Sequence, residues 1–313
     1  MGTPEFAVET LKALVENNYN VVAVVTQPDK PVGRHQTEMQ PSQVKQYAVA
    51  HGLPVLQPEK MKDPVFIEQL RSYNANLQVV VAFRMLPEVV WAMPEYGTFN
   101  VHAALLPQYR GAAPINWAVI NGETQTGVTT FFLDHDIDTG RIILKKTFDI
   151  PDEADVEYVY DGLMHLGAQI CLETLEAIVA ANGHPDSIPQ DSVLDGSAIK
   201  PAPKIFKETC EIDWKKTAKQ VYDFVRGLSP YPGAWTTLVA PDGKETVLKI
   251  YKTRKTGKPG KGVGTINIEG KALCVSAADE QLEIVELQLA GKKRMMARDF
   301  LNGMKQIEDY RVK

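Results

Sequence analysis

The chain has 313 residues, of which 44% are hydrophobic and 23% are charged. This composition is typical of a globular protein, and it excludes disordered and fibrous chains. No apolar run approaches the roughly 18 residues of a membrane span, and no basic stretch with an apolar core opens the chain as in a signal peptide. We therefore expect a cytoplasmic protein without a membrane partner, which acts as a monomer.

Charge is distributed unevenly along the chain. Residues 1–203 carry 13 Lys and Arg against 25 Asp and Glu, whereas residues 204–313 carry 21 against 14. The stretch KIYKTRKTGKPGK, residues 249–261, contains only basic charged residues. Such a run either binds a polyanion such as a phosphate backbone or forms a solvated loop. The charge split indicates two domains with different partners.

The first part of the chain alternates between strand and helix patterns. Strands are expected at 20–27, 53–58, 77–83, 98–103, 127–133 and 141–148, the last two as a hairpin, and helices at 5–17, 64–73, 86–92, 113–121 and 154–181. The continuous β-branched runs are typical of strands that are buried on both faces. This alternation predicts an α/β domain with a Rossmann-like, mostly parallel sheet covered on both faces.

The first residues, MGTPEFA, have the pattern of a Gly-containing turn that follows a strand. Pro4 would lie in the first turn of the next helix, where proline is favoured. No strand-like residues precede this turn. Either the true start lies upstream or the sheet lacks the strand that normally begins such a unit, and we expect the first of these.

The second part of the chain has a different organisation. Residues 184–203 are rich in Pro, Ser, Asp and Gly, which predicts a linker between domains at 1–183 and 204–313. After a helix at 215–227, short strands separated by turns are expected at 235–240, 246–252, 263–268, 271–276 and 281–288. Five such strands are typical of a small β-barrel of the oligonucleotide-binding (OB) type.

The stretch TFNVHAALLP contains the residues most suited to chemistry. Asn100 and His102 are two residues apart, so their side chains share one face of a strand, near its end. Asp138, in the hairpin turn, could return beside them. An amide, an imidazole and a carboxylate without a Ser or Cys nucleophile suit a reaction in which the substrate is the nucleophile. Alternatively, His102 is a structural core residue and Asp138 a turn residue.

Other reactive residues give weaker patterns. Asp134, His135 and Asp136 could suggest a metal site, but alternation places neighbours on opposite faces, and we expect no metal. Three cysteines, at 171, 210 and 274, match neither a disulfide framework nor a metal-ligand spacing, so we expect reduced thiols.

Several sequence blocks carry a resemblance to a known family. NVHAALLPQYRGAAPIN and GVTTFFLDHDIDTGRI resemble the folate-dependent formyltransferases. MGTPEFA, TQPDKPVGR, LPVLQPEKM and LQLAGKKRMMARDFLNG are similar to the branch of that family that formylates methionyl-tRNA. The resemblance implies a catalytic formyltransferase domain followed by a tRNA-binding domain. It also implies formyl transfer from 10-formyltetrahydrofolate to the α-amino group of methionyl-initiator-tRNA, for translation initiation.

The resemblance also implies roles for individual residues. Asn100 would hold the formyl oxygen, His102 would assist proton movement, and Asp138 would bind His102 or a catalytic water. The residues implied to line the folate pocket are Ala104, Leu105, Leu106 and Pro107, and those implied to contact tRNA are Arg34, Lys292 and Lys293.

Two positions depart from the family pattern. Ala104 stands where the family usually has Ser, so a hydroxyl contact to the folate is lost while a backbone contact remains possible. The loop after Arg34 continues as His-Gln-Thr-Glu instead of with further basic residues. More of the tRNA binding is therefore expected from the C-terminal domain.

Other functions fit part of the pattern. A formyltransferase acting on a glycinamide ribonucleotide or an amino sugar would share the three catalytic residues, as would a hydrolase that deformylates the folate. Neither needs a basic second domain. A nucleic-acid-binding module without activity would need the basic domain but not the intact site.

Overall fold

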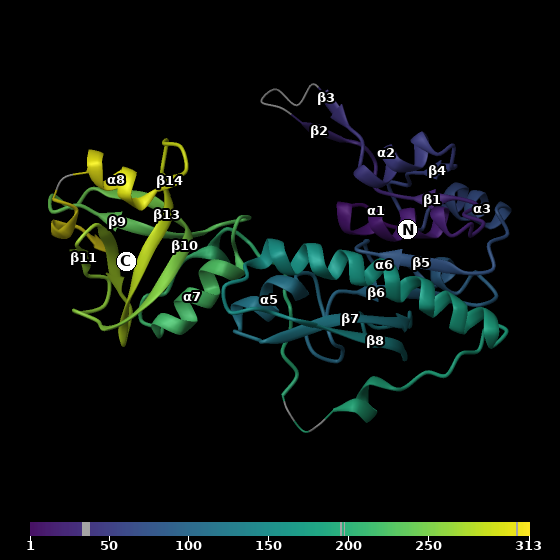
Figure 1. Cartoon of the computed structure of the whole chain (residues 1–313). Coiled ribbons are helices and arrows are strands. Elements are labelled where there is room, and N and C mark those ends of the chain that lie inside the picture. The colour runs from purple at the N-terminus through teal and green to yellow at the C-terminus, as the bar shows by residue number, and fades with distance from the viewer. Residues whose placement is uncertain (33–37, 195, 197, 305) are drawn as a thin grey trace. The chain divides into compact units, whose positions relative to one another are not determined.

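The structure is a computed structural model that describes residues 1–32, 38–194, 196, 198–304 and 306–313 (Figure 1). The chain forms two compact units. The first contains residues 1–111, 126–148 and 160–201, and the second contains residues 112–125, 149–159 and 202–313. The segment 184–203, predicted as a linker, thus belongs to the first unit up to Pro201. The predicted domain limits stay a prediction.

The first unit alternates strands and helices as predicted. Its helices are α1 (Glu5–Glu16), α2 (Gln43–Ala50), α3 (Pro64–Ser72), α4 (Glu88–Trp91), α6 (Val156–Ala180) and the 3-10 helix η1 (Gln190–Val193). Its strands are β1 (Val24–Val25), β2 (Lys30–Val32), β3 (Glu38–Gln40), β4 (Val55–Leu56), β5 (Gln78–Val81), β6 (Thr98–His102), β7 (Gln125–Phe132) and β8 (Ile142–Asp149). The β2–β3 hairpin and α2 were not predicted. The strand predicted at 20–27 is only two residues long.

The sheet of the first unit confirms the predicted α/β class. β1 pairs in parallel with β4, and β5 pairs in parallel with β6. β7 adds to β6 in the antiparallel direction, and β8 is the next neighbour of β7. The first unit therefore has a parallel two-stranded sheet, β1–β4, and a mixed four-stranded sheet, β5-β6-β7-β8, whose edge is formed by the predicted β7–β8 hairpin.

Met1 and Gly2 lie between the two parallel pairs. The Gly2 N–H donates to the Val25 oxygen of β1 at 3.0 Å. On the other side, the Val81 N–H of β5 donates to the Met1 oxygen at 2.9 Å, and the Met1 amino group donates to the Val79 oxygen at 2.7 Å. These two residues thus lie between β1 and β5 and make backbone hydrogen bonds to both strands.

A cavity of about 500 Å³ continues from this position. It is lined on one side by residues 20–25 and on the other by residues 74–79, with Leu11, Leu175 and Ile178 from the helices. Burial lowers the pKa of the Met1 amino group to about 6, against the opposing effect of Cys171. An unfolded amino group has a pKa near 8, so between pH 6 and 8 the unfolded chain binds more protons than the folded one. The free energy of unfolding therefore decreases as the pH is lowered from 8 to 6.

An engineered extension before Met1 is expected to stabilise the fold. Five or six β-branched residues would pair with both neighbouring strands, at about 0.5–1.5 kcal/mol net for each hydrogen bond, and would bury apolar side chains in the cavity. The extension also removes the buried amine, so its gain in unfolding free energy should be about 2 kcal/mol larger at pH 6 than at pH 8. Urea denaturation at the two pH values measures both effects.

A Gly/Ser extension of equal length is the control, because it moves the amine away without supplying apolar side chains. Its unfolding free energy should show the same pH-dependent increase, without the increase that comes from burying apolar side chains in the cavity. Equal stability of the two extended chains would show that the cavity does not accept a strand.

Helix α6 packs along the sheet with close glycine contacts. A Cβ on Gly162 would lie 2.2 Å from the Phe148 ring, and one on Gly167 would contact Phe6 and Val101 at 3.3–3.5 Å. Val101 therefore points towards α6. Since side chains alternate along a strand, Asn100 and His102 point to the opposite face.

The length and composition of α6 would allow it to cross a membrane, although no uninterrupted apolar run suggested this. It is the one such helix among the described residues, with a mean hydropathy of 1.3 and half of its 18-residue window buried. A core helix passes the same test, and the contacts with the sheet account for the apolar faces of α6.

The second unit is an antiparallel sheet with helices. Its helices are α5 (Pro114–Ile120), α7 (Ala218–Gly227), α8 (Ala297–Gly303) and the 3-10 helices η2 (Glu208–Cys210) and η3 (Ile307–Asp309). Its strands are β9 (Ala234–Val239), β10 (Glu245–Pro259), β11 (Ile266–Glu269), β12 (Ala272–Ser276), β13 (Glu280–Leu289), β14 (Met295–Met296) and β15 (Arg311–Val312).

The strand order in this sheet is β11-β12-β13-β10-β9-β15, and β14 pairs with β13. A bridge between Thr265 and Arg311 connects the two ends of the order. This confirms the predicted small barrel-like domain, with two short strands, β14 and β15, that were not predicted. The core contains Ile250, Leu282 and Leu287, which are fully buried.

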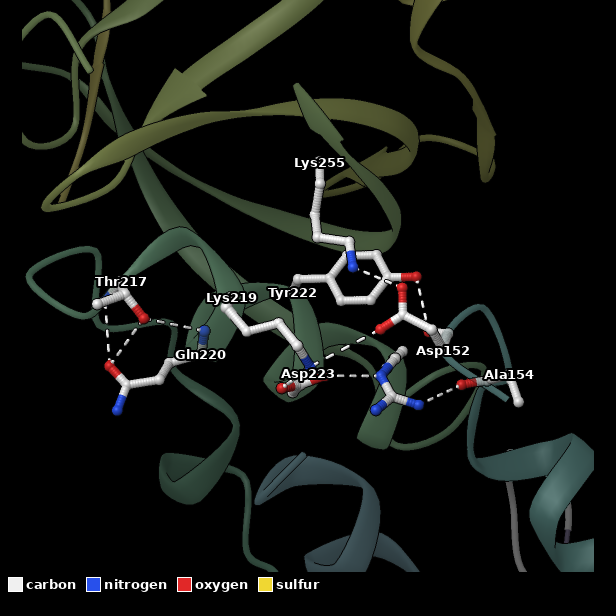
Figure 2. Close-up of polar contacts among 9 residues, drawn as sticks. Asp152, Ala154, Thr217, Lys219, Gln220, Tyr222, Asp223 and Lys255 are labelled. Atoms are coloured by element: carbon white, nitrogen blue, oxygen red, sulfur yellow. Dashed lines mark hydrogen bonds and ion pairs between the residues drawn. The ribbon is translucent and has the colours of Figure 1, made fainter. Parts of the chain in front are cut away.

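A cluster of charged residues joins α7 to the segment before α6 within the second unit (Figure 2). The Asp223 carboxylate is 5% exposed and accepts from Arg226 at 2.8 Å and from Lys219 at 2.6 Å. Lys255 of β10 pairs with Asp152, and Arg226 also donates to the Ala154 oxygen at 2.9 Å. Buried charges of this kind are tolerated because they are paired and hydrogen-bonded.

Candidate active site

Strand β6 carries Asn100 and His102 in the middle of its sheet. Asn100 lies opposite Val80 of β5 and Phe131 of β7, and His102 lies opposite Thr129. A strand with partners on both sides has little freedom, so both side chains start from a rigid backbone.

The His102 imidazole is 6% exposed and is held at one nitrogen. Its Nε2 lies 2.9 Å from the Tyr109 carbonyl oxygen. A carbonyl can only accept a hydrogen bond, so Nε2 carries a proton and donates it. Tyr109 has the left-handed backbone conformation, with φ of 61°, which aims this carbonyl at the ring. The second nitrogen, Nδ1, remains for chemistry.

The Asp138 carboxylate faces that second nitrogen. Its Oδ2 lies 3.9 Å from His102 Nδ1, and the carboxylate is 13% exposed. The same oxygen accepts a hydrogen bond from the Gly111 N–H at 3.0 Å. The structure thus brings together two residues that are 36 positions apart, with a distance that leaves the imidazole and carboxylate close but not directly hydrogen-bonded.

The Asn100 side-chain amide is incompletely bonded. Its Oδ1 is buried and has no hydrogen-bond partner among the residues that the structure describes. Leaving a buried polar atom without a partner costs about 1–3 kcal/mol, so such atoms need an explanation. A donor group of a ligand bound beside His102 would supply the hydrogen bond that Oδ1, an acceptor, lacks.

The segment 104–107 is largely enclosed by the protein. Ala104 and Leu106 have no exposed surface, and Leu106 packs with Phe131 and Ile142. The Thr129 hydroxyl donates to the Ala104 oxygen at 2.6 Å and accepts from the Leu106 N–H at 3.1 Å. Leu105 is half-buried and Pro107 is buried, so Leu105 is the member of the segment whose side chain is most accessible.

The acidic residues near Asp134 and the three cysteines have structural contacts and no arrangement suited to metal binding or nucleophilic attack in the described part of the chain. Asp134 accepts hydrogen bonds from the Asp136 N–H and the Thr139 hydroxyl, as a turn residue does. No group of three or more potential metal ligands was found within the described part of the chain. The three cysteines are free and buried, and burial raises the pKa of the Cys171 thiol to about 12, which makes it a poor nucleophile.

Comparison with known proteins identifies the family. A family model described as "Formyl transferase" matches residues 1–175, and one described as "Formyl transferase, C-terminal domain" matches residues 204–305. A methionyl-tRNA formyltransferase of Parabacteroides distasonis is 60% identical over 317 aligned residues, which cover this whole chain and 97% of that protein. This chain belongs to the methionyl-tRNA formyltransferase family. It is therefore an enzyme, a formyltransferase.

Further similar proteins agree with the assignment. A methionyl-tRNA formyltransferase of Bacteroides fragilis is 55% identical over 315 residues, covering this whole chain and 96% of that protein. An N-formyltransferase from Helicobacter canadensis, solved with folinic acid and dTDP-3-aminofucose, superposes with a TM-score of 0.59 at 19% identity, covering 90% of this chain and 96% of that one. At this identity the superposition shows the fold alone.

The predicted tRNA-contacting residues of this formyltransferase lie in different surroundings. Arg34 falls in 33–37, outside the described residues. Lys292 and Lys293 are exposed, in the turn between β13 and β14. The next residue, Arg294, is instead bound to the Glu286 carboxylate and lies 4.1 Å from the Tyr251 ring centroid.

Two residues that were not among the predicted site residues support the site of the enzyme. Thr129 holds the segment 104–106 through its hydroxyl, and Gln190 contacts the loop that carries Asp138. Thr129 is one of three buried threonines of β7, with Thr126 and Thr130, so the strand pattern alone does not single it out. Gln190 lies in a segment whose composition predicted only a linker.

Proposed function

We propose that Asn100, His102 and Asp138 carry out the formyl transfer of this enzyme, from 10-formyltetrahydrofolate to the α-amino group of methionyl-initiator-tRNA. The observation that carries the proposal is the group of three polar residues on and beside β6. One is a half-buried amide whose Oδ1 is buried and has no partner among the described residues, and the other two are an imidazole and a carboxylate 3.9 Å apart. These groups suit acyl transfer between two substrates.

Each residue has a distinct task in this proposal. The amine nitrogen attacks the formyl carbon, a C–N bond forms, and the bond from that carbon to the folate nitrogen breaks. The Nδ2–H of the Asn100 amide donates to the formyl oxygen as that oxygen gains negative charge, and Oδ1, which can only accept, is left for an N–H group of a substrate. His102 receives the amine proton on Nδ1 and returns it to the departing folate nitrogen, so the enzyme ends unchanged. Asp138 faces Nδ1 at 3.9 Å and stabilises the positive charge that the ring carries after it receives the proton.

The Asn100→Ala variant tests the amide's task. Removing one oxyanion donor typically lowers kcat by about 10²–10³-fold. Because Oδ1 has no partner within the described structure, we expect the variant to unfold at a denaturant concentration close to that of the wild type. Asn267→Ala removes another amide with an unpaired buried oxygen and should leave kcat unchanged. A loss of stability that matched the loss of activity would contradict this assignment.

The folate co-substrate is proposed to bind beside the segment Ala104–Pro107. With Ala104, Leu106 and Pro107 buried and the Ala104 carbonyl already bonded to Thr129, we assign the main side-chain contact to Leu105. Ala104 is proposed to contribute by its small size and not by a side-chain hydrogen bond.

The tRNA is proposed to contact Arg34, Lys292 and Lys293. Exposed lysines in a turn can follow a phosphate backbone. Several other cations of the basic β10 strand are paired with carboxylates, as in Arg254 with Glu283, and these are poorer candidates. We further propose that the enzyme acts in the cytoplasm as a monomer, without a membrane partner or a metal.

A panel of formyl acceptors tests the proposed substrate. The purified enzyme is given 10-formyltetrahydrofolate with methionyl-initiator-tRNA, uncharged tRNA, free methionine or a dTDP-linked amino sugar. We expect transfer to methionyl-initiator-tRNA alone, and a higher KM for the tRNA in the Lys292→Gln, Lys293→Gln double variant with an unchanged KM for the folate. Efficient transfer to the amino sugar, or none to methionyl-tRNA, would contradict the proposal.

A further inference from the structure

The segment that follows α6 is attached to the loops around the candidate site. Figure 1 shows it running along β8 after the end of α6. Ile188 and Ile142 exchange two backbone hydrogen bonds of 2.8 Å, and Arg141 donates to Ser187. Further on, the Lys200 oxygen accepts from the Tyr109 N–H at 2.7 Å, on the residue whose carbonyl holds His102.

Gln190 is the buried anchor of this segment, with 3% exposure. Its Oε1 accepts two hydrogen bonds from the Arg110 guanidinium, at 3.0 and 2.7 Å. Its Nε2 donates to two backbone carbonyl oxygens, that of Asp138 at 2.8 Å and that of Gly140 at 2.9 Å. Both lone pairs and both N–H groups of the side-chain amide are therefore used. A fully bonded, buried network of this kind holds its members in one arrangement.

These bonds fix the geometry of the Asp138 carboxylate from two sides. Asp138 has φ of 56°, in the left-handed region that is uncommon for residues other than glycine and is adopted more readily by Asp than by most. Gln190 binds the backbone carbonyl of Asp138 and the side chain of Arg110. Arg110 is followed in the chain by Gly111, and the Gly111 N–H donates to the Asp138 carboxylate. One side chain thus determines the relative position of the carboxylate and its hydrogen-bond donor.

We propose that Gln190 is a positioning residue for the formyl transfer. It keeps the Asp138 carboxylate opposite His102 Nδ1. The inference rests on the proposed function, because it assigns Gln190 a role through the proposed catalytic carboxylate. It makes the segment after α6 part of the framework of the active site.

The test uses two substitutions in the full-length enzyme. Gln190→Leu removes all four hydrogen bonds, and Gln190→Glu keeps the acceptor for Arg110 while placing a carboxylate oxygen against the two carbonyls. A misplacement of about 1 Å can cost about 10²-fold in rate, so we expect kcat to fall by about 10–100-fold. The KM values for folate and tRNA should stay within about threefold, because Gln190 does not contact either substrate in this proposal. Gln190→Glu carries the test if the Leu variant does not fold.

A double-variant comparison separates positioning from a general structural effect. In an Asp138→Asn background, where the carboxylate is already absent, substitution of Gln190 should lower kcat by less than about twofold. Ser187→Ala loosens the same segment away from Asp138 and should retain wild-type kcat. A wild-type kcat in Gln190→Glu, or an equal loss with and without Asp138, would overturn the inference. Absence of transfer by the unmodified enzyme would instead overturn the proposed function.

Discussion

Formyl transfer by the His102→Gln variant is expected to be slower than that of the wild type by a factor of about 10²–10⁴, the usual contribution of a general acid–base group. Glutamine can still donate to the Tyr109 oxygen that Nε2 reaches at 2.9 Å, so the local backbone keeps its hydrogen bond. It has no nitrogen that can accept the amine proton opposite Asp138. The rate should therefore fall without a corresponding loss of fold. Single-turnover transfer and thermal unfolding measure the two properties.

A matched control is available in the same unit. His165 is 69% exposed and lies 3.9 Å from Glu9, on the surface of α6. His165→Gln should therefore keep the wild-type rate. If His102→Gln transferred formyl within a few-fold of the wild type, His102 would be the buried structural histidine that the sequence pattern also allowed.

The largest effect on stability is expected for Asp223→Ala in the second unit. Asp223 and Arg226 are both less than 10% exposed at their side chains, and the substitution would leave the guanidinium buried without its carboxylate. Breaking a buried pair in this way typically costs about 3–5 kcal/mol of unfolding free energy. Denaturation in urea, followed by a probe in the second unit such as Trp214 fluorescence, measures the loss.

Glu283→Ala provides the comparison, because it breaks the Arg254–Glu283 pair, in which the arginine is 67% exposed. Exposed pairs contribute about 0–1 kcal/mol, so this variant should be close to the wild type. Replacing Asp223 and Arg226 together by leucine should cost less than the two single substitutions combined, because no unpaired charge remains. Equal effects of Asp223→Ala and Glu283→Ala would contradict this account of the cluster.

The sequence predicted the order and type of most elements, but it could not predict strand lengths. The β-branched run at 20–27 has the composition of a long buried strand, yet only Val24 and Val25 form one. Strand length depends on the partners, and the paired residues of β1 are those that lie opposite Val55 and Leu56 of β4. The α2 helix was missed although Ser42, whose side chain accepts from the Lys45 N–H, is a recognisable N-cap.

The site was predicted in part. The spacing of Asn100 and His102 is sufficient to place them on one face of a strand, and the hairpin turn suggested that Asp138 returns to them. The contributions of Tyr109 and Gln190 could not be predicted, because they depend on backbone conformation and on contacts between distant segments. A composition rich in Pro, Ser and Asp indicates a loop, but it does not reveal that one of its side chains is buried against another loop.

The most direct test of the account is single-turnover transfer of an isotopically labelled formyl group from 10-formyltetrahydrofolate to methionyl-initiator-tRNA. The wild-type enzyme is compared with the Asn100→Ala, His102→Gln double variant, and binding of both substrates is measured in parallel. We predict labelled N-formylmethionine on the tRNA with the wild type, and unchanged binding with almost no label for the double variant. Transfer by the double variant within tenfold of the wild-type rate would contradict the assignment of the chemistry to this site.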